Sequence, residues 1–178
     1  LSADALAALS VKAIPALVLK NVTPDNFNVL TPAQVAALTV DQVKSISTAT
    51  YTSISDDNLA AFTAKGTLSS IDFKKVPASI ISKFLPSQIA GLTDAQLASL
   101  DTTRVAQFTV DQAAALTATQ AKAFTPNFVK FLSDDGVSGL TPATLAAIPP
   151  KSFAAITNLD ALTDVNTPAL TSAQVNAL

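Results

Sequence analysis

The chain contains no cysteine, histidine, methionine, tryptophan or glutamate, and Tyr51 is its single tyrosine. Without cysteine there are no disulfides, and the thiolate and imidazole ligands that zinc and iron prefer are missing. Histidine, the commonest general acid and base, and the cysteine nucleophile are missing as well. We therefore predict no cofactor, no metal site and no enzymatic activity, and no sequence pattern selects two aspartates as an acid/base pair.

Charge is also scarce, since charged residues make up 13% and hydrophobic residues 49% of the 178 residues. A chain this apolar must bury much of itself and is not expected to be disordered. Its net charge of −2 offers no basic stripe for a nucleic acid. The apolar runs are far shorter than the roughly 20 residues that span a membrane. We expect neither a nucleic-acid partner nor membrane insertion.

An eight-residue unit recurs along the chain. Residues 30–37, 38–45, 92–99 and 170–177 share the order apolar, Thr, any, any, Gln, apolar, followed by two residues that are mostly small. A fixed period of this kind is the signature of a repeat architecture. We interpret 1–178 as a single octad-repeat domain. Octads fill 1–16, 22–61, 68–155 and 162–177, and shorter units that shift the phase of the repeat lie at 17–21, 62–67 and 156–161.

The residue types within the octad predict a short helix that restarts every eight residues. Ser or Thr, which are preferred N-cap residues, fill the second position in 16 of 20 octads. The third position, where proline recurs, is then the first helical residue. Gln at the fifth position completes a capping box, and the apolar first and sixth positions form a hydrophobic staple. The predicted N-caps are Thr23, Thr31, Thr39, Ser55, Thr93, Thr109, Thr117, Thr125, Thr141 and Thr171.

Continuous helices and strands fit this pattern poorly. Apolar steps of five and three residues would drift around a continuous helix, which the recurrent proline would also break. A β-solenoid needs alternation and β-branched residues, whereas these octads are rich in Ala and Gln. Because so short a helix melts alone, the octads must stack. We predict an all-α solenoid, a superhelix of very short helices with one helix per eight-residue repeat, and two to four octads in each coil.

Three surface features suggest binding sites. The acidic pairs Asp56-Asp57 and Asp134-Asp135 offer oxygen ligands to calcium, but first-turn aspartates also complement the helix dipole, which is the favoured interpretation. The Thr/Ser ladder presents hydroxyls to a glycan or to ice, although capping already accounts for each hydroxyl. Phe124, Phe128 and Phe131 form an apolar cluster, which we predict to be a partner-binding patch.

Segments 30–43, 92–100, 108–123 and 170–178 resemble the Leu-Thr-x-x-Gln-Ile/Val-x-Ala octad arrays of very large bacterial surface proteins labelled haem-utilisation or adhesion proteins. The consensus Gln fills 7 of 20 octads here. The resemblance implies an extracellular or cell-surface location and adhesion or matrix contact. It does not imply haem binding, because the usual iron ligands are missing and Tyr51 lies at a core position.

We therefore expect a structural spacer, adhesion or filament-forming segment; the alternative is a binding module that uses a solenoid face for a glycan, a peptide or ice. The sequence starts with Leu and not Met, and the array begins and ends at the first octad position without a polar capping repeat. A piece of a longer array, or subunits that associate end to end, is the expected state. A glycan or another surface protein is a further expected partner.

Overall fold

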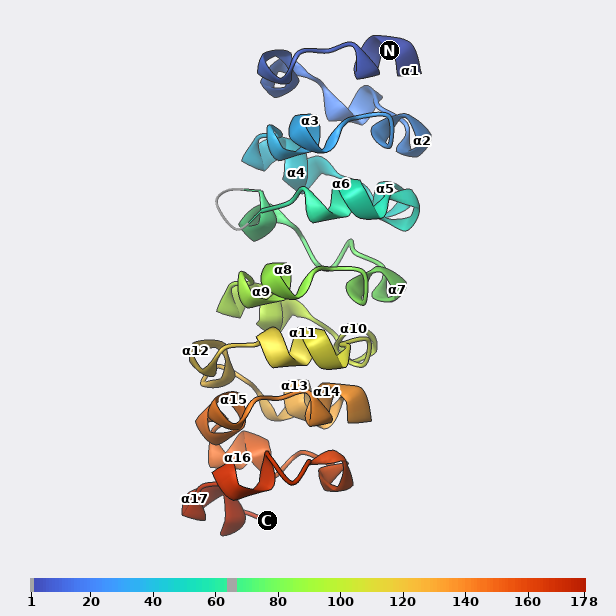
Figure 1. The fold of residues 1–178 in the computed structure, drawn as a ribbon. Coiled ribbons are helices and arrows are strands. Elements are labelled where there is room, and N and C mark those ends of the chain that lie inside the picture. The colour runs from blue at the N-terminus through green and yellow to red at the C-terminus, as the bar shows by residue number, and fades with distance from the viewer. Residues whose placement is uncertain (1, 64–66) are drawn as a thin grey trace. The chain divides into compact units, whose positions relative to one another are not determined.

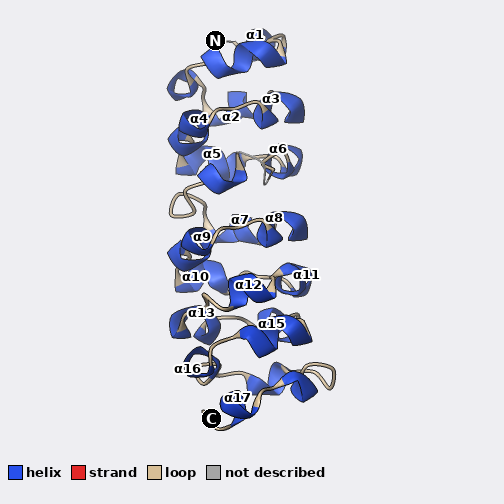
Figure 2. Ribbon diagram, turned by 90° about the vertical axis from the view of Figure 1, so that its left-hand side faces the viewer, coloured by secondary structure: helices blue, strands red, loops and turns tan. Residues whose placement is uncertain are grey.

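The computed structural model describes residues 2–63 and 67–178, and these residues contain helices but no strand (Figure 2). The short helices pack against one another in sequence order, which confirms the prediction of an all-α solenoid. The α-helices are α1 (Ala3–Ala7), α2 (Pro24–Phe27), α3 (Pro32–Ala36), α4 (Val40–Ser45), α5 (Thr48–Ser53), α6 (Asp56–Ala60), α7 (Ala78–Ile81), α8 (Pro86–Ala90), α9 (Asp94–Ser99), α10 (Thr102–Val105), α11 (Val110–Ala115), α12 (Ala118–Ala121), α13 (Pro126–Lys130), α14 (Asp134–Ser138), α15 (Pro142–Ala147), α16 (Pro150–Phe153) and α17 (Ser172–Val175). The 3₁₀ helices are η1 (Val11–Ala16), η2 (Leu19–Asn21), η3 (Leu68–Ser70), η4 (Leu159–Ala161) and η5 (Thr167–Ala169).

Three octads form 3₁₀ helices in place of α-helices. In 9–16, Pro15 lies inside η1 and removes a backbone donor that an α-helix needs. In 68–75, Ser69 lies within η3 and is therefore not its N-cap, which corrects the expectation for this second position. In 162–169, the helix η5 is limited to three residues near the end of the octad. Of the predicted short units, 17–21 contains η2 and 156–161 contains η4, whereas residues 64–66 of 62–67 lie outside the described residues.

The chain forms two compact units, residues 1–84 and 85–178. In the first unit, η1, α3 and α6 stack on one another, as do η2, α4 and η3, and α2 packs on α5 (Figure 1). Since two helices lie between α3 and α6 along the chain, each helix meets the helix three places further on. Three repeats therefore complete one coil, within the expected range of two to four.

The second unit repeats this arrangement. One stack consists of α8, α11, α14 and η4, a second contains α12, α15 and η5, and a third consists of α10, α13, α16 and α17 (Figure 1). The short unit 156–161 contributes η4 to the first stack, so it occupies a full place in the coil. The order of the stacks therefore continues unchanged across this short unit.

First- and sixth-position side chains make up most of the apolar core. Between residues 30 and 155 every first-position side chain is buried except Leu100, which is partly exposed. Sixth-position residues such as Val35, Leu97 and Phe153 are buried as well. Burial of each such side chain contributes roughly 1.5–3 kcal/mol to folding, which is the stabilisation that an isolated octad lacks.

Candidate functional site

All ten predicted N-cap residues precede a helix and accept a hydrogen bond from the backbone N–H three residues ahead. Thr31 Oγ1 accepts from Gln34 N at 3.3 Å, and Thr125 Oγ1 accepts from Phe128 N at 3.1 Å. Each hydroxyl thereby satisfies one of the orphan donors at a helix start. The remaining eight are Thr23, Thr39, Ser55, Thr93, Thr109, Thr117, Thr141 and Thr171.

The fifth-position Gln connects two successive coils. Gln120 Oε1 accepts the N–H of Thr117 at 2.9 Å, which completes the capping box of α12. The Nε2 group of the same side chain donates to Ile89 O at 3.1 Å and to Leu92 O at 2.9 Å. Gln174 does the same with Leu145 O at 2.8 Å and Ile148 O at 2.9 Å. One buried amide therefore serves the start of its own helix and two carbonyls of the coil before it.

Shorter polar side chains at the fifth position make the same connection. Asn58 Nδ2 donates to Phe27 O at 3.4 Å, and the hydroxyls of Thr144 and Ser152 donate to Leu116 O and Phe124 O, both at 2.7 Å. The acceptors are Phe27 at the end of α2, Leu116 at the C-cap of α11 and Phe124 in the loop before α13. Each bond links residues 28 or 31 positions apart, so it fixes the register between coils.

This second function of the fifth position was not predicted from the sequence. The capping box involves residues three apart and can be recognised locally, whereas the carbonyl acceptors depend on how many octads close a coil. One signal was present in the composition. Glutamate suits a capping box as well as glutamine does, but it cannot donate when ionised, and the chain contains no glutamate.

The three residues of the predicted partner patch do not form one exposed cluster. Phe124 and Phe128 are 4% and 5% exposed and belong to the core, and only Phe131, 37% exposed, reaches the surface. Phe128 stacks on Phe124 with ring centroids 4.4 Å apart and meets the edge of Phe108 at 6.0 Å. The error has a physical cause: the fifth position faces the preceding coil and not the solvent.

The acidic pairs lie in the first turns of α6 and α14. Asp56 forms an exposed ion pair with Lys83, 3.0 Å between Oδ1 and Nζ. Asp134 Oδ1 accepts a hydrogen bond from Asn158 Nδ2 at 2.8 Å. Within 2–63 and 67–178, no group of three or more carboxylates is close enough to hold a metal ion.

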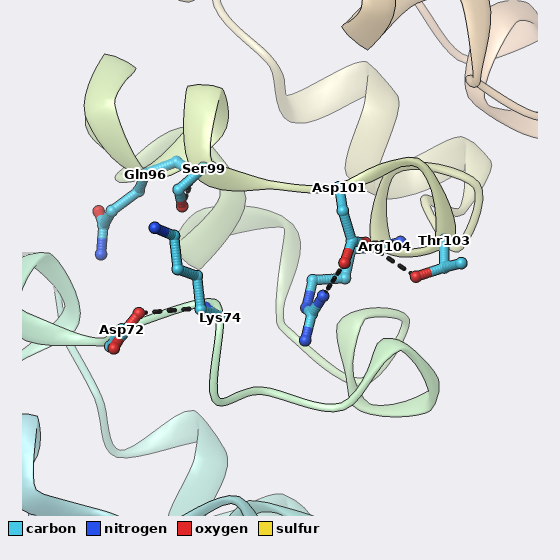
Figure 3. A network of polar contacts seen from close by, with 7 residues as sticks. All are labelled: Asp72, Lys74, Gln96, Ser99, Asp101, Thr103 and Arg104. Carbon is cyan, nitrogen blue, oxygen red and sulfur yellow. Dashed lines mark hydrogen bonds and ion pairs between the residues drawn. The ribbon is translucent and has the colours of Figure 1, made fainter.

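Asp101 is an N-cap that the Ser/Thr pattern overlooked, although aspartate is an equally good cap. Figure 3 shows its carboxylate between Thr103 and Arg104. Burial acts to raise the pKa of this carboxyl. The hydrogen bonds from Thr103 Oγ1 and the Arg104 N–H, together with the guanidinium charge, outweigh burial and hold the pKa below its usual value. The group caps α10 and shows no sign of the raised pKa that a catalytic acid needs.

Tyr51 is fully buried at the sixth position of 46–53, and its hydroxyl has no hydrogen-bond partner among the described residues. Burial raises the pKa of the phenol, and the charge of Asp72 raises it further. The hydroxyl therefore remains protonated at neutral pH. An unpaired buried hydroxyl opposes folding, because it has left water without replacing its hydrogen bonds.

We expect Tyr51→Phe to stabilise the protein by about 1 kcal/mol, because it removes the unpaired hydroxyl and retains the ring. Urea unfolding of the two proteins at neutral pH measures the difference. The effect has a pH signature, since a raised folded-state pKa makes the wild type lose stability above about pH 10, where the unfolded tyrosine ionises first. A loss of stability in the variant at neutral pH would show that the hydroxyl has a favourable partner.

Comparisons with protein-family models, curated proteins and solved structures found no match. Among the described residues, no helix is both long enough and apolar enough to cross a lipid bilayer.

Proposed function

We propose that the chain is a structural repeat segment of an extracellular or cell-surface protein, where it acts as a spacer, in adhesion or in a filament. The supporting observation is the use of its recurring polar groups. The second-position hydroxyls cap helices, and fifth-position side chains such as Gln34 and Gln174 bond to the preceding coil. These recurring polar groups are used to hold the array together. Repetition of the octad then supplies length and stiffness.

The last coil of the second unit supports association with further octads. Its sixth-position residue Val175 is 52% exposed, although sixth-position residues of interior coils such as Leu145 are fully buried. First-position residues Leu162 and Leu170 are partly exposed there as well. In interior coils, backbone carbonyls at the first and sixth positions, such as those of Leu92 and Ile89, accept hydrogen bonds from the fifth-position side chain of the next coil. Another octad coil, whether from continuing chain or from a second copy, fits this face.

Sedimentation velocity over a concentration series tests the association of copies. We expect the wild type to associate, and Val175→Asp to need at least about tenfold higher concentration, because a charge would be buried in the contact. Val40→Asp is the control: Val40 is 46% exposed at the first helical position of α4 and belongs to the first unit. A wild type that stays monomeric throughout, or equal shifts in both variants, would contradict end-to-end association.

Antibody labelling tests the location independently. We expect antibodies raised against the chain to label intact source cells or their surroundings. Labelling that requires permeabilised cells would contradict a surface role and leave the association result untouched.

A further inference from the structure

Two fifth positions of the second unit carry no side-chain donor, Phe128 and Gly136. In the octad of Gly136, the Ser133 hydroxyl reaches the preceding coil at Phe108 O, 3.4 Å away. Among the residues that the structure describes, the octad of Phe128 has no such substitute. Phe128 occupies the fifth position of 124–131, and a phenyl ring cannot donate a hydrogen bond.

One octad earlier, Gln120 donates to Ile89 O and Leu92 O. By the same register, Phe128 stands opposite the carbonyls of Leu97 and Leu100. Leu97 O accepts the Leu100 N–H at 3.2 Å, and within the described residues no donor reaches Leu100 O.

A groove of about 370 Å³ lies at this place, lined by Leu97, Leu100, Asp101, Val105, Asn127 and Phe128 among others. Its volume is that of a small-ligand site. Leu100 is the single first-position residue between 30 and 155 that is not fully buried. The missing donor, the partly exposed core residue and the groove therefore coincide.

We propose that this groove binds a primary carboxamide on a short alkyl stem, as in the glutamine side chain of a partner peptide. The preceding octad shows the bonding: the Gln120 amide donates to Ile89 O at 3.1 Å and to Leu92 O at 2.9 Å, with a longer contact to Ala90 O at 3.4 Å. A primary amide has two N–H donors for two acceptors. Leu97, Val105 and the Phe128 ring supply apolar walls for the stem.

The charges around the groove favour a neutral amide over charged ligands. A carboxylate would meet two carbonyl oxygens and the carboxylate of Asp101. An ammonium would lose its hydration without finding a free counter-charge, because Asp101 is already paired with Arg104. The ligand thus takes the place of the side chain that this octad lacks, and the site adds peptide recognition to a structural array.

Titration of the ¹⁵N-labelled protein with acetyl-Leu-Gln-Leu-N-methylamide tests the proposal. The acetyl and N-methylamide groups make both ends of this peptide secondary amides, so the Gln side chain is its single primary amide. We expect saturable shifts of the backbone amides of Leu100, Asp101 and Val105. Peptides with Glu, Lys or norleucine in place of Gln should bind at least about tenfold more weakly, the loss expected for two hydrogen bonds. No saturable shift, equal binding of the norleucine peptide, or tighter binding of the Lys peptide would overturn the proposal.

Two Phe→Gln variants, one inside the groove and one outside it, add a structural control. Phe128→Gln supplies the missing donor from within the chain, so we expect it to reduce peptide binding at least about tenfold. Phe131→Gln introduces the same side chain at an exposed position outside the groove and should bind the peptide within about threefold of wild type. Unchanged affinity in a folded Phe128→Gln protein would overturn the proposal. If that variant does not fold, the ranking of the four peptides on the wild type decides the question.

Discussion

Gln120→Glu is expected to destabilise the second unit by about 3 kcal/mol or more at neutral pH, although the side chain keeps its length and shape. The new carboxylate still accepts the Thr117 N–H, so the capping box survives. It cannot donate to Ile89 O or Leu92 O, and it places a charge against these two carbonyls in a side chain that is 5% exposed. Repulsion and desolvation act together here.

The same variant has a characteristic pH dependence. Burial beside carbonyl oxygens raises the folded-state pKa of the new carboxyl above its unfolded value of about 4.3. With a raised folded-state pKa, the variant is most stable relative to wild type below about pH 4 and loses stability as the pH rises through the folded pKa. The protonated acid also regains one donor for the carbonyls.

Urea midpoints at about pH 4 and pH 7 measure this effect. The control is Gln107→Glu, because Gln107 is exposed and the substitution makes the same change in charge. We expect the control to follow the wild type at both pH values. Equal midpoints of the two variants at neutral pH would show that the donor half of the Gln120 side chain contributes nothing to coil stacking.

The sequence predicts the local hydrogen bonds of Gln120, which form the capping box, but not its hydrogen bonds to the preceding coil. Thr117 and Gln120 are three residues apart, so their capping box follows from helix geometry. Leu92 is 28 residues before Gln120, and no local rule connects them. The separation shortens to 25 residues between Gln42 and Leu17 O, where the five-residue unit 17–21 intervenes, and to 26 between Gln174 and Ile148 O, across the six-residue unit 156–161.

The assignment of Phe128 to a surface patch failed for the same reason. Helical periodicity shows which residues share one face of a helix, and the first and sixth positions already accounted for the core. The fifth position becomes a second buried row because three repeats per coil place it over the helix ends of the preceding coil. That number depends on packing between repeats, and the octad pattern allowed two, three or four.

Close packing between coils gives a second strong prediction at Gly139, the C-cap of α14, a helix that packs on α11. Its φ of −76° is available to any residue, so backbone conformation does not require glycine. Space does: an added Cβ would overlap Val110 O and come within 2.9 Å of Val110 Cα and Ala113 Cβ. Two of these three atoms belong to backbone, which moves only if the coils separate.

Gly139→Ala is therefore expected to destabilise the second unit by about 2–3 kcal/mol, as overpacking does in a tight core. At a compatible φ without this contact, the same change would stabilise by about 0.4–1 kcal/mol through the unfolded chain, so the sign alone identifies the cause. Gly136→Ala is the matched control. Its nearest neighbour would be Leu132 Cδ2 at 3.0 Å, the end of a side chain that can rotate away, and its unfolding midpoint should stay close to that of the wild type. Two alanine variants with the same midpoint would mean that α14 has room to move away from α11, and that the spacing between coils is set by the fifth-position hydrogen bonds and not by contact of the backbones.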